Sequence, residues 1–373
     1  MARHLSYLNI DTFRGIMDLE LKDLGDVNIL VGANNSGKTS VLEAIMLLGA
    51  PDDFSNILGI SRLREGNRIS PRFGISFYDS FIYLFNRLSE EMLINVSCEI
   101  DDQKVFLRLE GRIEKVLVDL NEVMRNSFVA RNKNSDEPLN DSEEIDSFIG
   151  EIQFGKGKLQ LDLSSNTIPV NFNKYDRSMR MERKVPFLKV PFISTIDHIV
   201  KNNFREIVRN KKLNSSVVEV LNLFDPCISD LRIIQEEDGR INQVIDNVIL
   251  DYMPLSTYGD GIKKIIALAN GIAEAKNGVL LVDEIETSIH ASVLKKVFSW
   301  LINACKEFNV QMFLTTHSLE TVDAIINCDE SFIGEDLIRV ITLVKKENQT
   351  IARVLTGEKA LQVRDDYDME LRS

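Results

Sequence analysis

Cysteine, histidine and tryptophan are scarce in this chain, and long apolar runs are absent. Its 373 residues include 4 cysteines, 4 histidines and 1 tryptophan. The cysteines are scattered, with no C-x-x-C pair and no close histidine partner, at Cys98, Cys227, Cys305 and Cys328. This spacing predicts neither a disulfide framework nor a zinc site, and it fits a reducing cytoplasm.

Neither a membrane segment nor a leader is evident. The longest apolar runs are too short to cross a bilayer, and Met1–Tyr7 lacks the apolar core of a signal peptide. The formal net charge of −13 argues against a uniformly basic nucleic-acid binder, although it is compatible with a local basic face. We therefore expect a cytoplasmic protein without membrane contact, and 44% hydrophobic content is enough for one large core or two modest ones.

What the chain does contain is a phosphate-binding pattern. Gly32–Thr39 reads G-A-N-N-S-G-K-T and matches G-x-x-x-x-G-K-[ST], the P-loop. The apolar run Val27–Val31 before it predicts a buried strand, and the helical spacing of Val41, Ile45 and Leu48 after it predicts a helix. Such an arrangement directs backbone N–H groups and a helix dipole at a polyphosphate. A chance match in a tight turn is the alternative, and the flanking strand and helix argue against it.

A second run, Val279–Val282, ends in two acids, Asp283 and Glu284. Four apolar residues in a row predict a buried parallel strand that delivers these acids at its carboxyl edge. Asp283 is expected to hold Mg²⁺ together with the hydroxyl of Thr39. Glu284 stands where a general base would orient the attacking water. A plain strand-end turn is the alternative reading of these acids.

Two further segments complete the pattern. Gln311–Thr315 is another apolar strand, followed by a polar cluster in which His317 can donate to a γ-phosphate. Gly259 and Gly261 open an amphipathic helix, which predicts a second anion site at a helix N-terminus. One nucleotide hardly needs two phosphate cradles. We therefore expect two chains to meet head to tail, each completing the site of the other.

The order of these motifs resembles that of ABC-type ATPase heads. In detail, Tyr258–Gly261, Asp283–His290 and Thr315–Ser318 resemble the OLD-like (overcoming lysogenization defect) branch, which is related to the RecF and SMC heads. Phe13-Arg14-Gly15 agrees with this branch. The resemblance covers residues 3–50 and 250–325, and it implies an ATPase that uses ATP and Mg²⁺.

The resemblance also implies roles for individual residues. Lys38, Glu284 and His317 would be catalytic, Thr39 and Asp283 would hold the metal, and Glu286–His290 would be a dimer-facing D-loop. The nucleotide would be bound by Gly32, Asn34, Asn35, Ser36, Gly37, Lys38, Thr39, Ser40 and Arg14, with Gly259 and Gly261 supplied by the partner. No glutamine precedes Gln103, so the Q-loop residue is absent or displaced, and Asp79 and Asn86 are its candidate substitutes. The signature also lacks the serine-glycine-glycine spelling, which points to contacts through backbone N–H groups.

The expected fold is an α/β P-loop NTPase, a single ABC-ATPase-like head over 1–373 with a mixed sheet, an antiparallel β subdomain and a helical insertion. Its parts are a P-loop lobe (1–50), an antiparallel region (90–172), a basic helical insertion (174–225) and a signature, Walker B and histidine lobe (250–344). We expect a loop over 51–75 and a short helix within 73–88. Residues 134–151 hold seven acids and no lysine or arginine, which predicts a solvated, mobile loop. Strands are expected at Glu151–Phe154, Lys158–Leu163, Ile228–Gln235 and Gln243–Leu250, and helical turns at 196–207 and 217–223.

Residues 174–212 carry eleven Lys/Arg against four acids, a net of 11 − 4 = +7. This segment is a candidate contact for duplex DNA, and a solvated face or a site for an acidic partner are the alternatives. Many OLD-like proteins continue into a TOPRIM nuclease domain, but only 55 residues follow Ser318 (373 − 318). The effector is therefore expected to be a separate protein, with a nuclease as the candidate, in phage defence or DNA maintenance. The alternatives are a RecF-like DNA-binding repair ATPase and a non-hydrolysing ATP-sensing scaffold.

Overall fold

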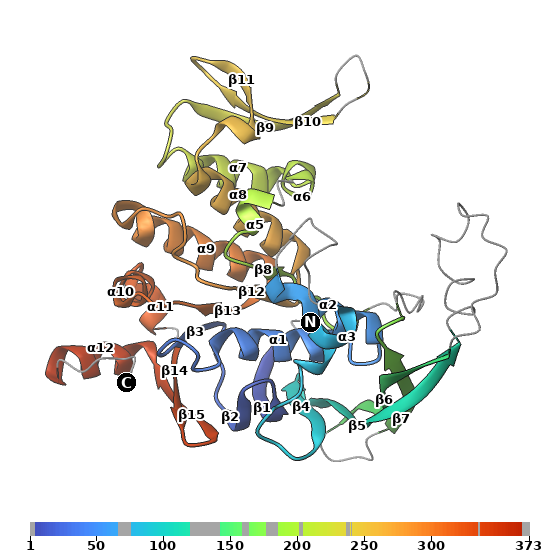
Figure 1. The fold of residues 1–373 in the computed structure, drawn as a ribbon. Helices are drawn as coiled ribbons and strands as arrows, with labels where there is room; N and C mark the ends of the chain where they lie inside the picture. Colours follow the sequence, from blue (N-terminus) through green and yellow to red (C-terminus); the bar gives the residue numbers. More distant parts are fainter. Residues whose placement is uncertain are drawn as a thin grey trace.

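Three β-sheets with helices between and above them build the molecule (Figure 1). The structure is a computed structural model that describes residues 4–65, 76–119, 142–158, 164–176, 186–200, 204–235, 239, 241–334 and 336–367. None of the helices in these ranges is long and apolar enough to cross a membrane.

The central sheet has six strands in the order β15-β14-β3-β13-β12-β8. Neighbours from β14 to β8 are parallel, and β15 pairs with β14 in the antiparallel direction. The strands are β3 (Val27–Val31), β8 (Phe192–Ile193), β12 (Val279–Val282), β13 (Gln311–Thr315), β14 (Ile338–Lys346) and β15 (Gln349–Thr356). The expected strands at the P-loop, the paired acids and the histidine thus lie side by side, and the motifs follow their carboxyl ends.

Both faces of this sheet are covered, which explains its unbroken apolar runs. All residues of β3, β12 and β13 are buried. Alternate side chains enter different cores: Leu30 and Phe313 belong to one cluster, whereas Ile29 and Leu314 belong to the other. Strands buried on both faces lack the polar alternation of half-exposed strands.

The second sheet is antiparallel, in the order β2-β1-β4-β5-β6-β7. Its strands are β1 (Leu5–Phe13), β2 (Ile16–Leu21), β4 (Met92–Ile100), β5 (Gln103–Asp119), β6 (Ser142–Lys158) and β7 (Ser164–Asn173). Helix α1 (Lys38–Gly49) lies between this sheet and the central one (Figure 1) and shares a core with both.

The opposite face of the central sheet carries a second group of helices, most of which lie above it in Figure 1. They are α5 (Asp197–Val200), α6 (Arg205–Arg209), α7 (Lys211–Leu221), α8 (Asp260–Glu274), α9 (Leu294–Phe308) and α10 (Leu319–Ile326). Near the carboxyl end, α11 (Glu330–Gly334) precedes β14 and α12 (Gly357–Tyr367) follows β15. A small sheet, β11-β10-β9, lies above them with β9 at Ile228–Gln235, β10 at Ile241–Asn247 and β11 at Asp251–Pro254.

The expected loop over 51–75 is wrong in its first part. Residues Phe54–Arg62 form helix α2, and Leu63–Glu65 form a 3₁₀ turn; residues 66–75 lie outside the described part. Asp53 caps α2 by accepting a bond from the Ser55 N–H, and Ile57 is buried. An N-cap followed by a short apolar face was the signal for this helix. The expected short helix is present as α3 (Phe77–Ile82).

The expected acidic loop is also wrong from Ser142 onward, where β6 begins and pairs with β5. A strand can carry these acids because their side chains lie on its exposed face: exposed Glu144 and Asp146 alternate with buried Ile145 and Ser147. That alternation is the pattern of a half-exposed strand. Residues 134–141 lie outside the described part, as do residues 159–163 of another expected strand, and β7 begins at Ser164.

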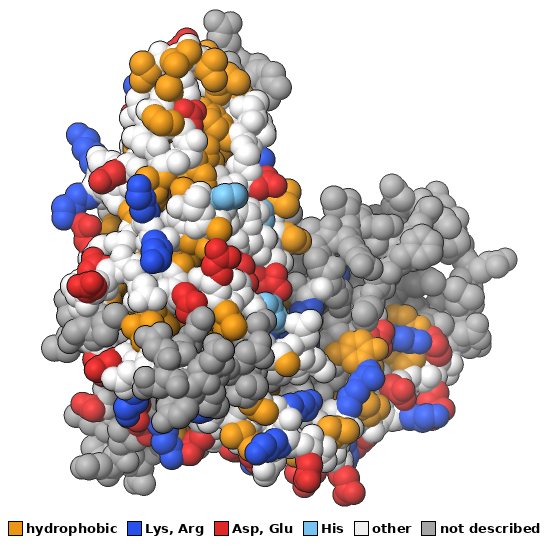
Figure 2. Space-filling view, turned by 90° about the vertical axis from the view of Figure 1, so that its left-hand side faces the viewer, with side chains coloured by type: hydrophobic (Ala, Val, Ile, Leu, Met, Phe, Trp, Pro, Cys, Tyr) orange, Lys and Arg blue, Asp and Glu red, His pale blue; other side chains and the backbone are white. Residues whose placement is uncertain are grey.

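Above the central sheet, several helices and strands begin or end at other residues than expected. The helical pattern over 196–207 corresponds to two short helices, α5 and α6, and α7 begins earlier than expected. Strand β10 ends at Asn247, so Val248–Leu250 form a turn instead of a strand. Their exposed fractions are 77%, 75% and 59%, and Figure 2 shows apolar side chains gathered at the top of the molecule, over this sheet.

Candidate nucleotide site

The P-loop joins β3 to α1 with an unusual backbone that fits a phosphate cradle. Gly32, Asn35 and Gly37 have φ of 146°, 64° and 104°. A Cβ at Gly32 would lie 2.5 Å from the Leu343 carbonyl oxygen, so no larger residue fits there without a shift. Helix α1 has no side-chain cap and no acid in its first turn. Its first N–H groups therefore remain available to an anion.

Lys38 is folded into this loop. Its ammonium donates to the carbonyl oxygens of Gly32 and Ala33, each at 2.9 Å, and the residue is 5% exposed. Burial lowers the pKa of Lys38, while the nearby carboxylates of Asp283, Glu284 and Glu286 oppose that shift. The buried hydroxyl of Ser36 has no partner in the described structure. Both groups fit a loop built to receive phosphate oxygens.

Thr39 and Asp283 are brought together as expected for a shared metal. The Thr39 hydroxyl lies 3.2 Å from one carboxylate oxygen of Asp283 and 3.3 Å from the other. Thr315 donates to Asp283 at 2.7 Å and accepts a bond from the Glu284 N–H at 2.9 Å. Mg²⁺ prefers oxygen ligands and usually takes only one or two carboxylates together with substrate phosphates. The hydroxyl and the carboxylate fit that ion.

Glu284 and His317 face each other at the same sheet edge. The imidazole Nε2 of His317 lies 3.9 Å from a Glu284 carboxylate oxygen, and both side chains are partly exposed. Glu284 has a φ of 45°, which follows from the sharp turn after β12. The His317 backbone N–H donates to Glu286 at 3.0 Å. The structure therefore places both side chains at the carboxyl edge of the central sheet, where the P-loop also begins.

The signature glycines lie elsewhere, on the far side of the central sheet. Gly259 precedes α8, and a Cβ there would meet nothing within 4 Å. At Gly261 a Cβ would lie 3.1 Å from the Ser288 carbonyl oxygen, so the signature and the D-loop are in contact. Within the described residues no hydrogen bond joins Gly259 or Gly261 to the P-loop. In the described part of one chain, the two expected anion sites are thus not joined by a hydrogen bond.

Arg14 does not face the P-loop phosphates. Its guanidinium pairs with Glu43 of α1 at 2.7 Å, and its side chain is 9% exposed. The residue near the P-loop is Arg64, which donates to the Ser40 hydroxyl at 2.8 Å and pairs with the same Glu43 at 2.6 Å. The sequence signal for Arg64 was its position as a basic residue just after α2, a helix capped by Asp53.

The two candidate Q-loop substitutes are also engaged elsewhere. Asp79 receives the Ser76 hydroxyl at 2.6 Å at the start of α3. Asn86 is buried and donates to the Ile16 carbonyl at 3.5 Å. In the described structure neither residue bonds to the P-loop, whereas Arg64 reaches Ser40.

The basic segment is only partly described, since residues 177–185 and 201–203 lie outside the described ranges. Three of its remaining cations pair with acids. Lys174 pairs with Glu143 at 2.8 Å, and Lys212 pairs with Glu307 at 2.7 Å. Arg209 pairs with Glu206 of its own helix. These pairs are exposed, so each adds little to stability.

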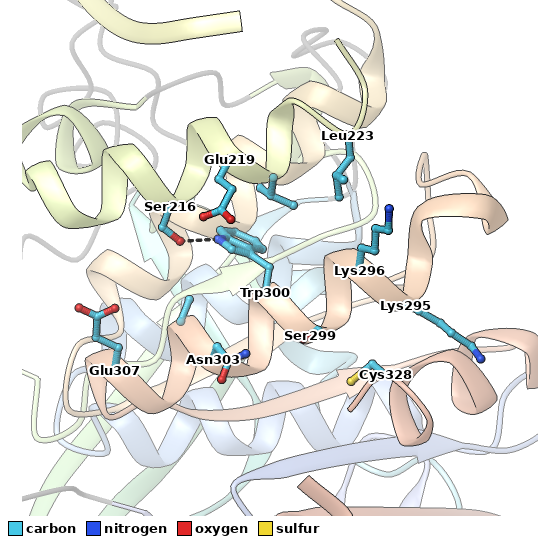
Figure 3. Close-up of a pocket in the computed structure, with 12 residues that line it drawn as sticks. Ser216, Glu219, Leu223, Lys295, Lys296, Ser299, Trp300, Asn303, Glu307 and Cys328 are labelled. Atoms are coloured by element: carbon cyan, nitrogen blue, oxygen red, sulfur yellow. Dashed lines mark hydrogen bonds between the residues drawn. The ribbon is translucent and has the colours of Figure 1, made fainter. Parts of the chain in front are cut away.

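A separate hollow of about 540 Å³ lies between α7 and α9 (Figure 3). Trp300 lies at its centre and donates to the Ser216 hydroxyl at 2.7 Å. Lys295 and Lys296 border one end, and Glu219 lies near the indole. No residue of the P-loop or of the Asp283-Glu284 pair lines it. The hollow is therefore distinct from the candidate nucleotide site.

The fold and the site together define a P-loop ATPase of the ABC type. Residues 27–323 match the family described as "AAA domain, putative AbiEii toxin, Type IV TA system", and the chain belongs to that family. The matched range contains the P-loop, the signature glycines, the paired acids and His317.

Individual proteins and solved structures are also similar to this chain. An "ATP/GTP phosphatase" of Helicobacter pylori is 24% identical over 372 residues, which is 94% of this chain and 95% of that protein. The "DNA replication and repair protein RecF" of Nitrosococcus oceani is 48% identical over 63 residues, 17% of each chain. Among solved structures, an SMC head bound to the C-winged helix domain of ScpA covers 96% of this chain and is itself 99% covered, with 14% identity and a TM-score of 0.48.

Proposed function

We propose that this chain hydrolyses ATP with Mg²⁺ and that two copies close head to tail over the nucleotide. The observation that carries the proposal is the placement of Lys38, Thr39, Asp283 and Glu284 at one sheet edge, with Thr315 holding the last two. Positioning and charge neutralisation dominate phosphoryl transfer, and this edge offers both. The Helicobacter pylori relative, described as a phosphatase of ATP and GTP, supports hydrolysis.

Each residue has a distinct task in this proposal. Mg²⁺, held by Thr39 and Asp283, would neutralise phosphate charge. Lys38 would leave its two carbonyl partners for phosphate oxygens. Glu284 would accept the proton of the attacking water, and His317 would donate to the terminal phosphate from the neighbouring strand.

The head-to-tail pairing is supported by the separation of the two anion sites. Gly259 is open, and Gly261 lies against Ser288 of the D-loop, so one surface presents both segments. We propose that this surface closes the site of a second copy. Membership of the OLD-like branch, a cytoplasmic location and control of a separate effector, with a nuclease as candidate, in phage defence or DNA maintenance belong to the same proposal.

Glu284→Gln tests the proposal directly. The variant should lose turnover by at least about a hundredfold and form ATP-dependent dimers in size-exclusion chromatography with light scattering. Glu320→Gln, an exposed glutamate at the start of α10, is the matched control and should behave as wild type. Wild-type protein with no Mg²⁺-dependent turnover would favour the ATP-sensing scaffold instead. Cutting of DNA by the purified protein alone would contradict a separate effector.

A RecF-like DNA-binding role is the second candidate, and the local RecF similarity favours it. Duplex DNA would contact residues 174–212. A salt-sensitive, ATP-dependent shift with duplex DNA that is lost on substitution of Lys211 and Lys212 would support it. If the protein leaves the mobility of duplex DNA unchanged at low salt, the RecF-like role is contradicted.

A further inference from the structure

Helix α8 carries a buried lysine that the nucleotide motifs do not use. Lys264 is 0% exposed, and its ammonium has neither a hydrogen-bond partner nor an ion-pair partner among the described residues. Its neighbour Lys263, by contrast, reaches the surface and pairs with Asp260 at 3.3 Å. A buried, unpaired ammonium is unfavourable, and natural structures rarely keep one without a use.

The complementary atom lies in the D-loop. One carboxylate oxygen of Glu286 accepts the His317 N–H at 3.0 Å, whereas the other is buried and without a partner. Among the acids whose charge acts on Lys264, Glu286 has the largest effect, ahead of Asp283, and burial lowers the pKa of Lys264 to about 8. An unpaired cation of α8 and an unpaired carboxylate oxygen of the D-loop are thus both buried, in two segments that touch where Gly261 lies against Ser288.

Other contacts tie the same loop to α8 and α5. Gly261, in the first turn of α8, lies against the Ser288 backbone. The Ser288 hydroxyl lies 3.0 Å from the His198 imidazole of α5, which is 2% exposed. The D-loop is therefore held on the side of the signature helix, and a small shift of α8 would change the distance between Lys264 and Glu286.

We propose that Lys264 is a positioning residue for hydrolysis: its ammonium pairs with the free Glu286 oxygen when a partner's nucleotide engages the signature, and this pair fixes His317. The chain of contacts runs from α8 through Lys264 and Glu286 to the His317 N–H. Packed helices shift by small steps, and one new ion pair suffices to favour one arrangement. This inference rests on the proposed ATPase function.

Lys264→Met separates positioning from folding. Methionine has a similar length and is apolar, so the thermal midpoint should stay equal or rise, because an unpaired buried charge is removed. The kcat for ATP should fall about tenfold or more, with little change in KM, since the binding residues are untouched. Lys263→Met is the control on the same helix and should keep kcat within about twofold.

Glu286→Gln should give a similar loss of kcat, and the double variant should be no slower than the slower single variant, because both changes remove one pair. Wild-type kcat in either single variant, or additive losses in the double variant, would overturn the role of Lys264. If Lys264→Met does not fold, Lys264→Gln, which is polar and uncharged, replaces it with the same expected loss of kcat. Wild-type protein without turnover would instead contradict the proposed ATPase function itself.

Discussion

The Thr39 hydroxyl lies 3.2 Å from an Asp283 carboxylate oxygen, although 244 positions separate the two residues in the chain. Thr39 follows β3 and Asp283 follows β12. These strands flank β13 and all three are parallel, so their carboxyl ends lie at one edge of the sheet. Thr315, at the end of β13, bonds to Asp283 and to the Glu284 backbone and so holds both acids. The first residue of the Thr315–Ser318 motif thus sets the geometry of the site.

Thr315→Val should therefore lower kcat by about tenfold, because valine keeps the shape and removes the hydroxyl that orients Asp283. The affinity for ATP should change much less. Steady-state turnover and nucleotide binding by fluorescence measure the two effects. Thr350→Val is the matched control, since the Thr350 hydroxyl is buried without a partner in the described structure. Equal kcat in wild type and Thr315→Val would contradict the role of Thr315.

Glu43→Ala should destabilise the fold strongly. Its fully buried carboxylate holds both Arg14 and Arg64, and burial lowers the pKa of Arg14 to about 10. Removing one partner of a buried ion pair typically costs about 3–5 kcal/mol. Arg64→Ala should cost less, because the Arg64 side chain is 46% exposed. Urea unfolding of both variants measures the order, and a larger loss for Arg64→Ala would refute this account.

A pair of glycine substitutions should have opposite effects. Gly32→Ala should abolish nucleotide binding and reduce stability, since the new Cβ meets the Leu343 carbonyl oxygen at 2.5 Å and φ is 146°. Gly59→Ala lies within α2, and its Cβ would meet nothing within 4 Å. Alanine there should raise the unfolding free energy by about 0.5–1 kcal/mol. Calorimetry and a nucleotide-binding titration test the pair.

The stability of the protein should depend on pH through Lys264. Its pKa falls from 10.5 to about 8 in the fold, so the cost of the buried ammonium is fully present below pH 8. Between pH 8 and 10.5 the native state has released this proton and the unfolded chain has not, so stability rises with pH. The surrounding charges are Glu286, Asp283, Asp197 and Glu284.

The measurement is the difference in unfolding free energy between Lys264→Met and wild type. The variant's advantage should be largest below pH 8 and shrink by up to about 3 kcal/mol toward pH 10.5. The same scan with Lys263→Met controls for general alkaline effects. A difference that does not change with pH would show that Lys264 titrates normally in the fold.

The sequence predicts the α/β P-loop fold because the motif strands are uninterrupted apolar runs with polar residues at their ends. It predicts the meeting of Thr39 with Asp283, since parallel strands deliver their carboxyl ends to one edge. It does not predict that Arg64 reaches Ser40, or that Thr315 of the Thr315–Ser318 motif bonds to Asp283, because both contacts arise only in the tertiary structure. It predicts the Glu151–Phe154 part of β6 and misses the strand from Ser142 onward, because the acids of residues 134–151 hide a period of two that only strand pairing reveals. It assigns Arg14 to the nucleotide because nothing in the sequence shows that Arg14 pairs with Glu43.

The position of β3 between β13 and β14 has a consequence during protein synthesis. Residues 27–31 leave the ribosome long before residues 311–315 and 338–346, which are their neighbours in the described sheet. Strand β3 is therefore apolar and without these strand partners while most of the chain is still being translated. Pairing over such distances is slow and exposes the waiting segment to aggregation. A growing chain in which the P-loop has been synthesised still lacks Asp283, Glu284 and β13 of the candidate nucleotide site until the last third of the sequence is translated.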